Sequence, residues 1–236
     1  MKHYVCRNCG YNIVGYLPDN CPFCLASKNQ FITAEECTKQ YEIIITKVNQ
    51  KVTRLNSTPR LGIEHAAYQI ETNQGTVMID CPSTFRDEIN PFNIILFTHH
   101  HFLGASVLYQ KHFKAEVWIH SEDSDNILTI NYKFDKLFNS NFSYAEIEAF
   151  HINGHTPGFT FYIFEDVLLI CDYFVGTTGN FRLNPYGPAQ DTLQGAREMK
   201  SVIENYNLKY VCGVNYVIPF REWKNNFERL LTPMGP

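Results

Sequence analysis

Short apolar runs separated by polar turns predict a chain built mainly of β-strands with a few helices. Alternating apolar and polar positions, or a continuous apolar run bounded by turn residues, are typical of strands. The predicted strands are 41–48, 66–71, 76–79, 92–97, 117–119, 159–164 and 167–171. The predicted helices are 103–113, 189–205 and 220–231. Residues 73–75, Asn-Gln-Gly, suit the hairpin turn between the second and third strands. The pattern predicts an α+β fold.

Composition indicates an intracellular protein without affinity for nucleic acid. The chain has 236 residues, of which 44% are hydrophobic, so it can bury a sizeable core. A charged-then-apolar leader and an apolar run of membrane-spanning length are both absent from the pattern, so we expect no membrane partner. The net charge of −4, without a basic run, argues against nucleic acid. Cysteines that bind metal need a reducing compartment, so we expect a cytoplasmic location.

Two cysteine pairs near the amino terminus predict a metal site. Cys6 and Cys9 form one pair, and Cys21 and Cys24 form the other after a gap of eleven residues. Pairs at this spacing let backbone amides donate to the thiolates, so that four sulfurs surround one ion. A tetrahedral four-sulfur site accepts either iron or zinc. The other cysteines lack paired spacing; they are Cys37, Cys81, Cys171 and Cys212. Of these, Cys81 and Cys171 are interpreted as small apolar residues at the ends of buried strands.

Histidines at the end of the strand predicted at 92–97 suggest a second metal site. His99 and His101 are separated by one residue, so in extended chain both imidazoles point the same way and can reach one ion. His100 between them should point away. We therefore interpret His100 as a packed or solvated residue and the other two as candidate ligands.

The amino-terminal segment resembles the short rubredoxin-like module of rubrerythrins. The resemblance rests on residues 4–11, Tyr-Val-Cys-Arg-Asn-Cys-Gly-Tyr, and on 21–24, Cys-Pro-Phe-Cys, and it covers about the first thirty residues. It implies redox-active iron, whereas a structural zinc ribbon is the alternative. We predict a rubredoxin-like four-cysteine domain at 1–30, a linker near 27–36 and a second domain at 37–236.

The second domain resembles the metallo-β-lactamase family. Thr98, His99 and His101, followed by Leu-Gly-Ala at 103–105, match the family's Thr-His-x-His-x-Asp-His loop with the Asp-His pair missing after Phe102. Residues 153–158, Asn-Gly-His-Thr-Pro-Gly, are similar to the family's next histidine turn, and 167–172 to the strand that ends in its bridging aspartate. The resemblance implies an αββα sandwich with ligands on loops at one edge of the sheets.

This resemblance implies one metal ion rather than two. It carries four ligand positions over to this chain, namely His99, His101, His155 and Asp172. The family's last histidine is absent, because no histidine follows His155, and Asn215 stands in the matching stretch. Imidazoles with a carboxylate suit iron, zinc or manganese. The alternative is that metal binding has been lost and the histidines are relics.

Three hypotheses for the function follow. The first is an iron redox protein in which the cysteine site exchanges electrons with a single His/Asp iron; persulfide dioxygenases resemble this ligand set at His99, His155 and Asp172. The second is a mononuclear zinc hydrolase of acyl or thioester substrates with a structural zinc knuckle. The third is a non-catalytic electron-transfer or binding module. We expect a small-molecule substrate and a redox partner protein, and the chain could form a homo-oligomer.

Overall fold

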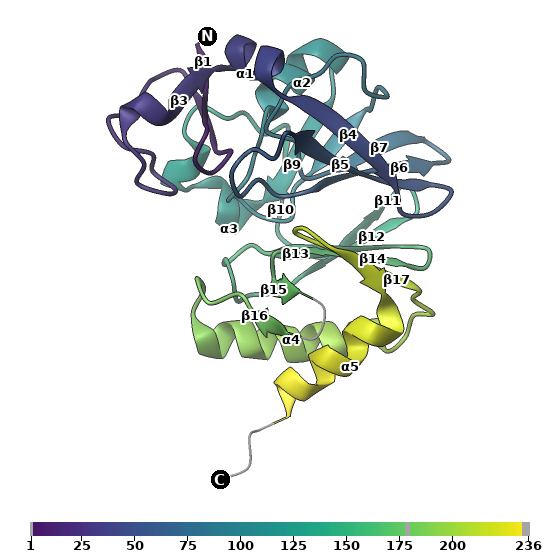
Figure 1. Cartoon of the computed structure of the whole chain (residues 1–236). Coiled ribbons are helices and arrows are strands. Elements are labelled where there is room, and N and C mark those ends of the chain that lie inside the picture. Colours follow the sequence, from purple (N-terminus) through teal and green to yellow (C-terminus); the bar gives the residue numbers. More distant parts are fainter. Residues whose placement is uncertain (1, 178–179, 233–236) are drawn as a thin grey trace. The chain divides into compact units, whose positions relative to one another are not determined.

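The computed structural model describes residues 2–177 and 180–232, and the chain folds as two compact units, 1–138 and 139–236 (Figure 1). The first unit begins with a small antiparallel sheet of order β2-β1-β3. Its strands are β1 (His3–Cys6), β2 (Asn12–Val14) and β3 (Phe31–Thr33). The first cysteine pair begins at the end of β1, so the sheet fixes where that pair lies.

The predicted linker near 27–36 is wrong, because this stretch is folded. It contains a 3-10 helix, η1 (Lys28–Gln30), then β3, and then the start of α1 (Ala34–Gln40). β3 pairs with β1, which satisfies its backbone groups. A capping box starts α1: Thr33 Oγ1 accepts from the Glu36 amide at 3.2 Å, and the Glu36 carboxylate accepts from the Thr33 amide at 2.8 Å. The separate domains at 1–30 and 37–236 stay a prediction.

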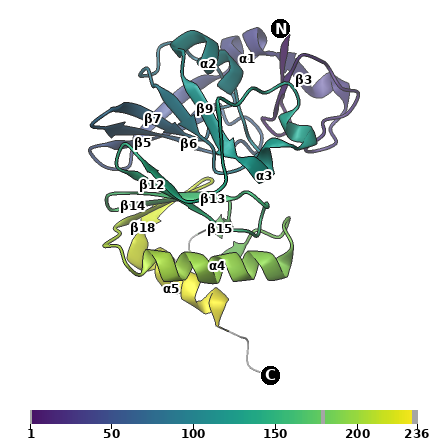
Figure 2. The same cartoon turned by 180° about the vertical axis from the view of Figure 1, so that it is seen from behind.

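A seven-stranded sheet forms the rest of the first unit, in the order β10-β9-β8-β7-β6-β5-β4. The strands are β4 (Glu42–Lys47), β5 (Val52–Thr58), β6 (Ala67–Thr72), β7 (Gly75–Ile79), β8 (Ile94–Leu96), β9 (Glu116–His120) and β10 (Lys136–Phe138). The pairings from β4 to β7 are antiparallel, and those from β7 to β10 are parallel. α2 (Ser106–Phe113) connects β8 to β9 and packs on the sheet through the buried Tyr109 (Figure 2). α3 (Ser121–Ser124) and η2 (Ile127–Thr129) follow β9.

The second unit is built on a six-stranded sheet of order β11-β12-β13-β14-β17-β18. Its strands are β11 (Phe142–Tyr144), β12 (Ile147–His151), β13 (Thr160–Phe164), β14 (Val167–Cys171), β17 (Tyr210–Gly213) and β18 (Val217–Pro219). β15 (Phe174–Thr177) and β16 (Asn180–Leu183) form a separate ribbon. α4 (Ala189–Ile203) and α5 (Phe220–Leu231) cover one face of the sheet (Figure 2). Phe161 and Leu168 of the sheet pack there with Met199, Trp223 and Phe227 of the helices.

The elements match the α+β prediction. The strands predicted at 41–48 and 167–171 and the helix predicted at 220–231 lie where the pattern placed them. The helix predicted at 103–113 starts later, at Ser106, because Gly104 has a left-handed φ of 54°. Among the residues that the structure describes, no helix is long and apolar enough to span a membrane.

Candidate metal centres

The four predicted cysteines come together beside the amino-terminal sheet. Their sulfur atoms all lie within 4.8 Å of one another. Cys6 Sγ is 3.8 Å from Cys24 Sγ, and Cys9 Sγ is 3.8 Å from Cys21 Sγ. Two backbone hydrogen bonds close the second pair's turn: the Leu25 amide donates to the Cys21 carbonyl at 2.9 Å, and the Cys21 amide donates to the Ala26 carbonyl at 2.7 Å. The turn therefore presents both of its thiols to the first pair.

This arrangement fits a tetrahedrally bound ion. Sulfurs held about 2.3 Å from a central ion would be separated by about 3.8 Å in a regular tetrahedron, and the two shortest separations have that length. The Tyr11 amide donates to Cys9 Sγ at 3.4 Å, and Asn8 Nδ2 donates to Cys24 Sγ at 3.3 Å. Donors of this kind stabilise thiolates. The donor set suits iron or zinc.

The close approach of the sulfurs shifts the pKa values of the cysteine thiols. Hydrogen bonds from Cys21 and Cys9 lower the pKa of Cys6, and hydrogen bonding with Cys21 and Cys6 raises the pKa of Cys9. The pKa of Cys21 is raised mainly by its hydrogen bond with Cys6. Sulfurs this close repel one another when all are ionised. A bound cation would remove that repulsion.

The loop that carries His99 and His101, residues 98–106, is called the histidine loop; it belongs to the same unit and follows β8. The ring centroids of His99 and His101 are 4.6 Å apart. Thr98 Oγ1 lies 2.9 Å from His99 Nδ1 and 2.9 and 3.0 Å from the two carboxylate oxygens of Asp80. An ionised carboxylate only accepts, so the single hydroxyl proton of Thr98 goes to Asp80, and His99 Nδ1 must donate to Thr98. His99 thus has its lone pair on Nε2, the tautomer that binds a metal through that atom.

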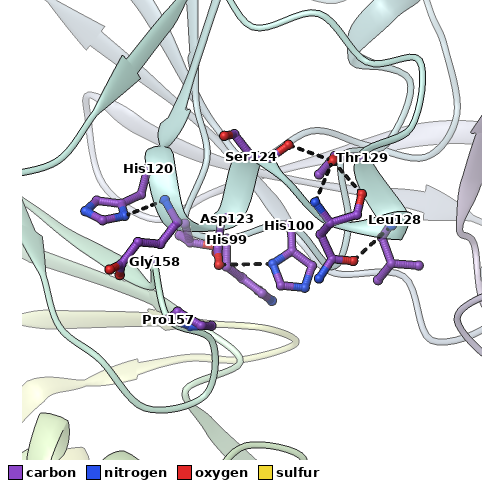
Figure 3. A network of polar contacts seen from close by, with 12 residues as sticks. His99, His100, His120, Asp123, Ser124, Leu128, Thr129, Pro157 and Gly158 are labelled. Atoms are coloured by element: carbon purple, nitrogen blue, oxygen red, sulfur yellow. Dashed lines mark hydrogen bonds and ion pairs between the residues drawn. The ribbon is translucent and has the colours of Figure 1, made fainter.

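His100 forms an ion pair away from His99, but its ring also lies edge-on to that of His101, with the centroids 4.7 Å apart, so the prediction that it points away from both neighbours is wrong for His101. His100 Nδ1 lies 3.1 Å from Asp123 Oδ1 of α3, and both side chains are buried (Figure 3). In the same region the His120 ring accepts from the Glu122 amide and caps the start of α3. His100 therefore anchors the loop to α3, and the His101 ring lies between those of His99 and His100, at 4.6 and 4.7 Å.

The loop turns sharply near the position where this chain lacks the Asp-His pair of the family's loop. Gly104 has a left-handed φ of 54°, and a Cβ added there would lie 2.2 Å from the Cys81 carbonyl oxygen. The Ala105 amide donates to the Pro82 carbonyl at 2.8 Å. Phe102, just before this turn, is buried with its ring centroid 3.9 Å from that of His65. An aromatic contact thus fills the space beside the shortened loop.

In the second unit, His155 and Asp172 lie together. β14 ends at Cys171, whose φ of 43° turns the chain so that Asp172 leaves the sheet. His155 Nε2 is 3.2 Å from Asp172 Oδ2, and both side chains are buried. This pair supplies an imidazole and a carboxylate, the donor types expected from the sequence. The use of His99, His101, His155 and Asp172 as one ligand set stays a prediction.

Asn184 contacts both His155 and Asp172, and the sequence did not predict it as a site residue. Its Nδ2 lies 3.1 Å from Asp172 Oδ2, 2.9 Å from the Asp172 carbonyl oxygen and 3.3 Å from His155 Nε2. Its Oδ1 accepts from the Tyr186 amide at 3.0 Å, so the amino group must face the pair. Asn184 precedes a proline, a signal for a turn that does not reveal which residues the amide would contact. Asn215, by contrast, is exposed between β17 and β18.

Comparison with known proteins agrees with both resemblances. Residues 4–32 match the rubrerythrin, rubredoxin-like domain family. No curated protein is significantly similar in sequence to this chain.

Solved structures of metallo-β-lactamases have a similar fold. A metallo-β-lactamase from Pontibacter korlensis is 14% identical and has a TM-score of 0.61, over 82% of this chain and 100% of its own. The DIM-1 metallo-β-lactamase is 13% identical with a TM-score of 0.64, over 80% and 97%. TTHA1623, solved in a di-iron-bound form, is 16% identical with a TM-score of 0.56, over 73% and 96%. The chain therefore combines a rubredoxin-like segment at residues 4–32 with a metallo-β-lactamase fold.

Proposed function

We propose that the protein is an iron redox protein in which a rubredoxin-like electron-transfer site serves a single iron bound by histidine and aspartate. The observation that carries the proposal is the presence of a four-cysteine cluster and candidate histidine ligands in one compact unit. Four cysteine sulfurs are arranged for a tetrahedral ion, and His99 has the tautomer that binds a metal through Nε2. The rubredoxin-like match supports iron at the first set.

The second ion is proposed to be held by His99, His101, His155 and Asp172. Each half of this set supports the proposal separately, since His99 lies beside His101 and His155 beside Asp172. Imidazoles with one carboxylate are a common ligand set for non-haem iron, and they also accept zinc or manganese. A protein of the same fold, TTHA1623, has been solved with iron bound. One ion is expected because the loop lacks the Asp-His pair.

An iron in this set would supply one-electron chemistry toward a small molecule such as oxygen, nitric oxide or a sulfur species. The chain's own residues orient the ligands. Thr98 and Asp80 keep the proton on His99 Nδ1, and Asn184 donates to the Asp172 carboxylate. Electrons would arrive at the cysteine site from a partner protein, and we propose a cytoplasmic location because that site needs reduced thiols.

Metal analysis of a histidine variant tests this assignment. His155→Ala, purified anaerobically from iron-supplemented cells, should lose the metal of the His/Asp site and keep that of the cysteine site. His112→Ala is the matched control, because His112 is exposed on α2 and lies outside both ligand sets. Unchanged metal content in His155→Ala would contradict the proposal and favour a non-catalytic module with relic histidines.

A mononuclear zinc hydrolase is the second candidate. The four-sulfur geometry accepts zinc as readily as iron, and two of the compared structures are metallo-β-lactamases. A lone zinc could still activate water toward an acyl or thioester substrate. Zinc at both sites, with hydrolysis of a thioester that is lost in His155→Ala, would favour this candidate over the redox protein.

A further inference from the structure

The cysteine site and the histidine loop touch through one aromatic side chain, Phe23. This residue lies between the predicted ligands Cys21 and Cys24 in the sequence. Its ring centroid is 4.8 Å from that of Phe102 and 5.7 Å from that of His101, with edge-on angles of 67° and 66°. These centroid distances fall within the range of favourable aromatic pairs. Phe23 therefore contacts the two residues that immediately precede the turn of the shortened loop.

Phe23 is held in place from the cysteine side. Its ring stacks on that of Tyr11 with the centroids 6.0 Å apart and the planes 14° apart. The Tyr11 hydroxyl donates to the Leu128 carbonyl, and its backbone amide donates to Cys9. An ion bound by Cys21 and Cys24 would fix the backbone on both sides of Phe23. The ring then has little freedom to leave the loop.

On this side the loop also contacts other residues of its own unit. Phe102 is buried between Phe23 and His65, and its neighbour His101 lies against His99. The hydroxyl of Tyr132 makes a second connection, 3.1 Å from the Asn12 carbonyl of β2 and 3.2 Å from the Gly104 carbonyl of the loop. The amino-terminal segment is thus connected to the loop through Phe23 at the His101 end and through Tyr132 at Gly104.

We propose that Phe23 couples the two candidate metal sites: occupancy of the cysteine site positions Phe23, and Phe23 positions His101 and Phe102. Phe23 is a positioning residue and binds no metal itself. The inference rests on the proposed function only in taking His101 as a ligand. Because coupling is reciprocal, loading the cysteine site should increase the affinity of the histidine site, and the converse should hold equally.

Hydrogen exchange of the loop tests the coupling without requiring a metal at the histidine site. In the full chain with zinc in the cysteine site, Phe23→Ala should speed amide exchange across residues 98–106. Phe31→Ala is the matched control, because Phe31 is also a partly buried aromatic packed on the cysteine cluster but makes no described ring contact with the loop. Phe23→Tyr, which keeps the ring, should restore slow exchange. Equal exchange in Phe23→Ala and wild type, or equal acceleration in Phe31→Ala, would overturn the proposal.

A cobalt titration gives a second readout. With zinc in the cysteine site, Phe23→Ala should bind Co²⁺ at the histidine site about fivefold or more weakly than wild type, the lower end of typical coupling between sites. Phe23→Leu repeats the comparison if the alanine variant loses its zinc. Unchanged Co²⁺ affinity would contradict the coupling. Failure of wild type to bind Co²⁺ would contradict the proposed function instead, and the exchange comparison would still decide whether Phe23 holds the loop.

Discussion

At the scale of single residues, the hydroxyl of Thr98 decides which nitrogen of His99 can bind a metal. Thr98→Val keeps the shape of the side chain but removes the group that links Asp80 to His99. We expect the metal affinity of the histidine site to fall roughly 10–100-fold, as is usual when the partner of a ligating histidine is lost. Competition with a chelator measures the affinity. Thr98→Ser retains the hydroxyl and should bind as wild type does, and a valine variant of normal affinity would refute this role.

Asn184 makes a comparable prediction in the second unit. Asn184→Ala removes the amide that donates to Asp172 and faces His155, so the carboxylate should be less well oriented. We expect weaker metal binding at the His/Asp site with no change in metal at the cysteine site. Asn207→Ala, at an exposed position outside the site, serves as the control. If both variants retained the same metal affinity, Asn184 would have no part in the site.

At the scale of elements, a buried carboxylate joins β5 to the segment that follows β7. Glu64 accepts from the Ser57 amide and hydroxyl, each at 2.9 Å, and from the Ser83 amide at 2.6 Å. In Glu64→Gln an amino group would face one of these donors, so the free energy of unfolding should fall by about 1–3 kcal/mol. Urea denaturation at neutral pH measures the change. Glu71→Gln, exposed at β6, should be close to wild type, and equal stability of the two variants would contradict this account.

Sequence periodicity predicted elements well where packing is regular. The sequence 220–231 has the periodicity of a helix with one apolar and one polar face, and the helix in the structure has the same bounds. Prediction failed where a contact distant in sequence decides the conformation. Residues 31–33 fall within the stretch predicted as a linker, yet they form β3 by pairing with β1. The start of α2 is likewise delayed by Gly104, which must lie against the Cys81 carbonyl.

Spacing in the sequence predicted only those candidate ligands that are close to one another along the chain. The cysteine pairs and the His99–His101 pair lie close in the sequence, so local geometry already brings their side chains together. Asn184 and Phe23 were not predicted to contact candidate ligands, because each reaches them through tertiary contacts that no local pattern encodes. The proton position on His99 likewise depends on Asp80, which follows a different strand, β7.

At the scale of the whole molecule, the central claim is that iron occupies both ligand sets and that the two exchange electrons. The most direct measurement is metal analysis of anaerobically purified protein, combined with absorption spectra during reduction by dithionite and reoxidation by oxygen. We predict an iron ion at each site and a thiolate-to-iron absorption that bleaches on reduction and returns on oxidation. Zinc at both sites, with no absorption change during the cycle, would contradict the redox function.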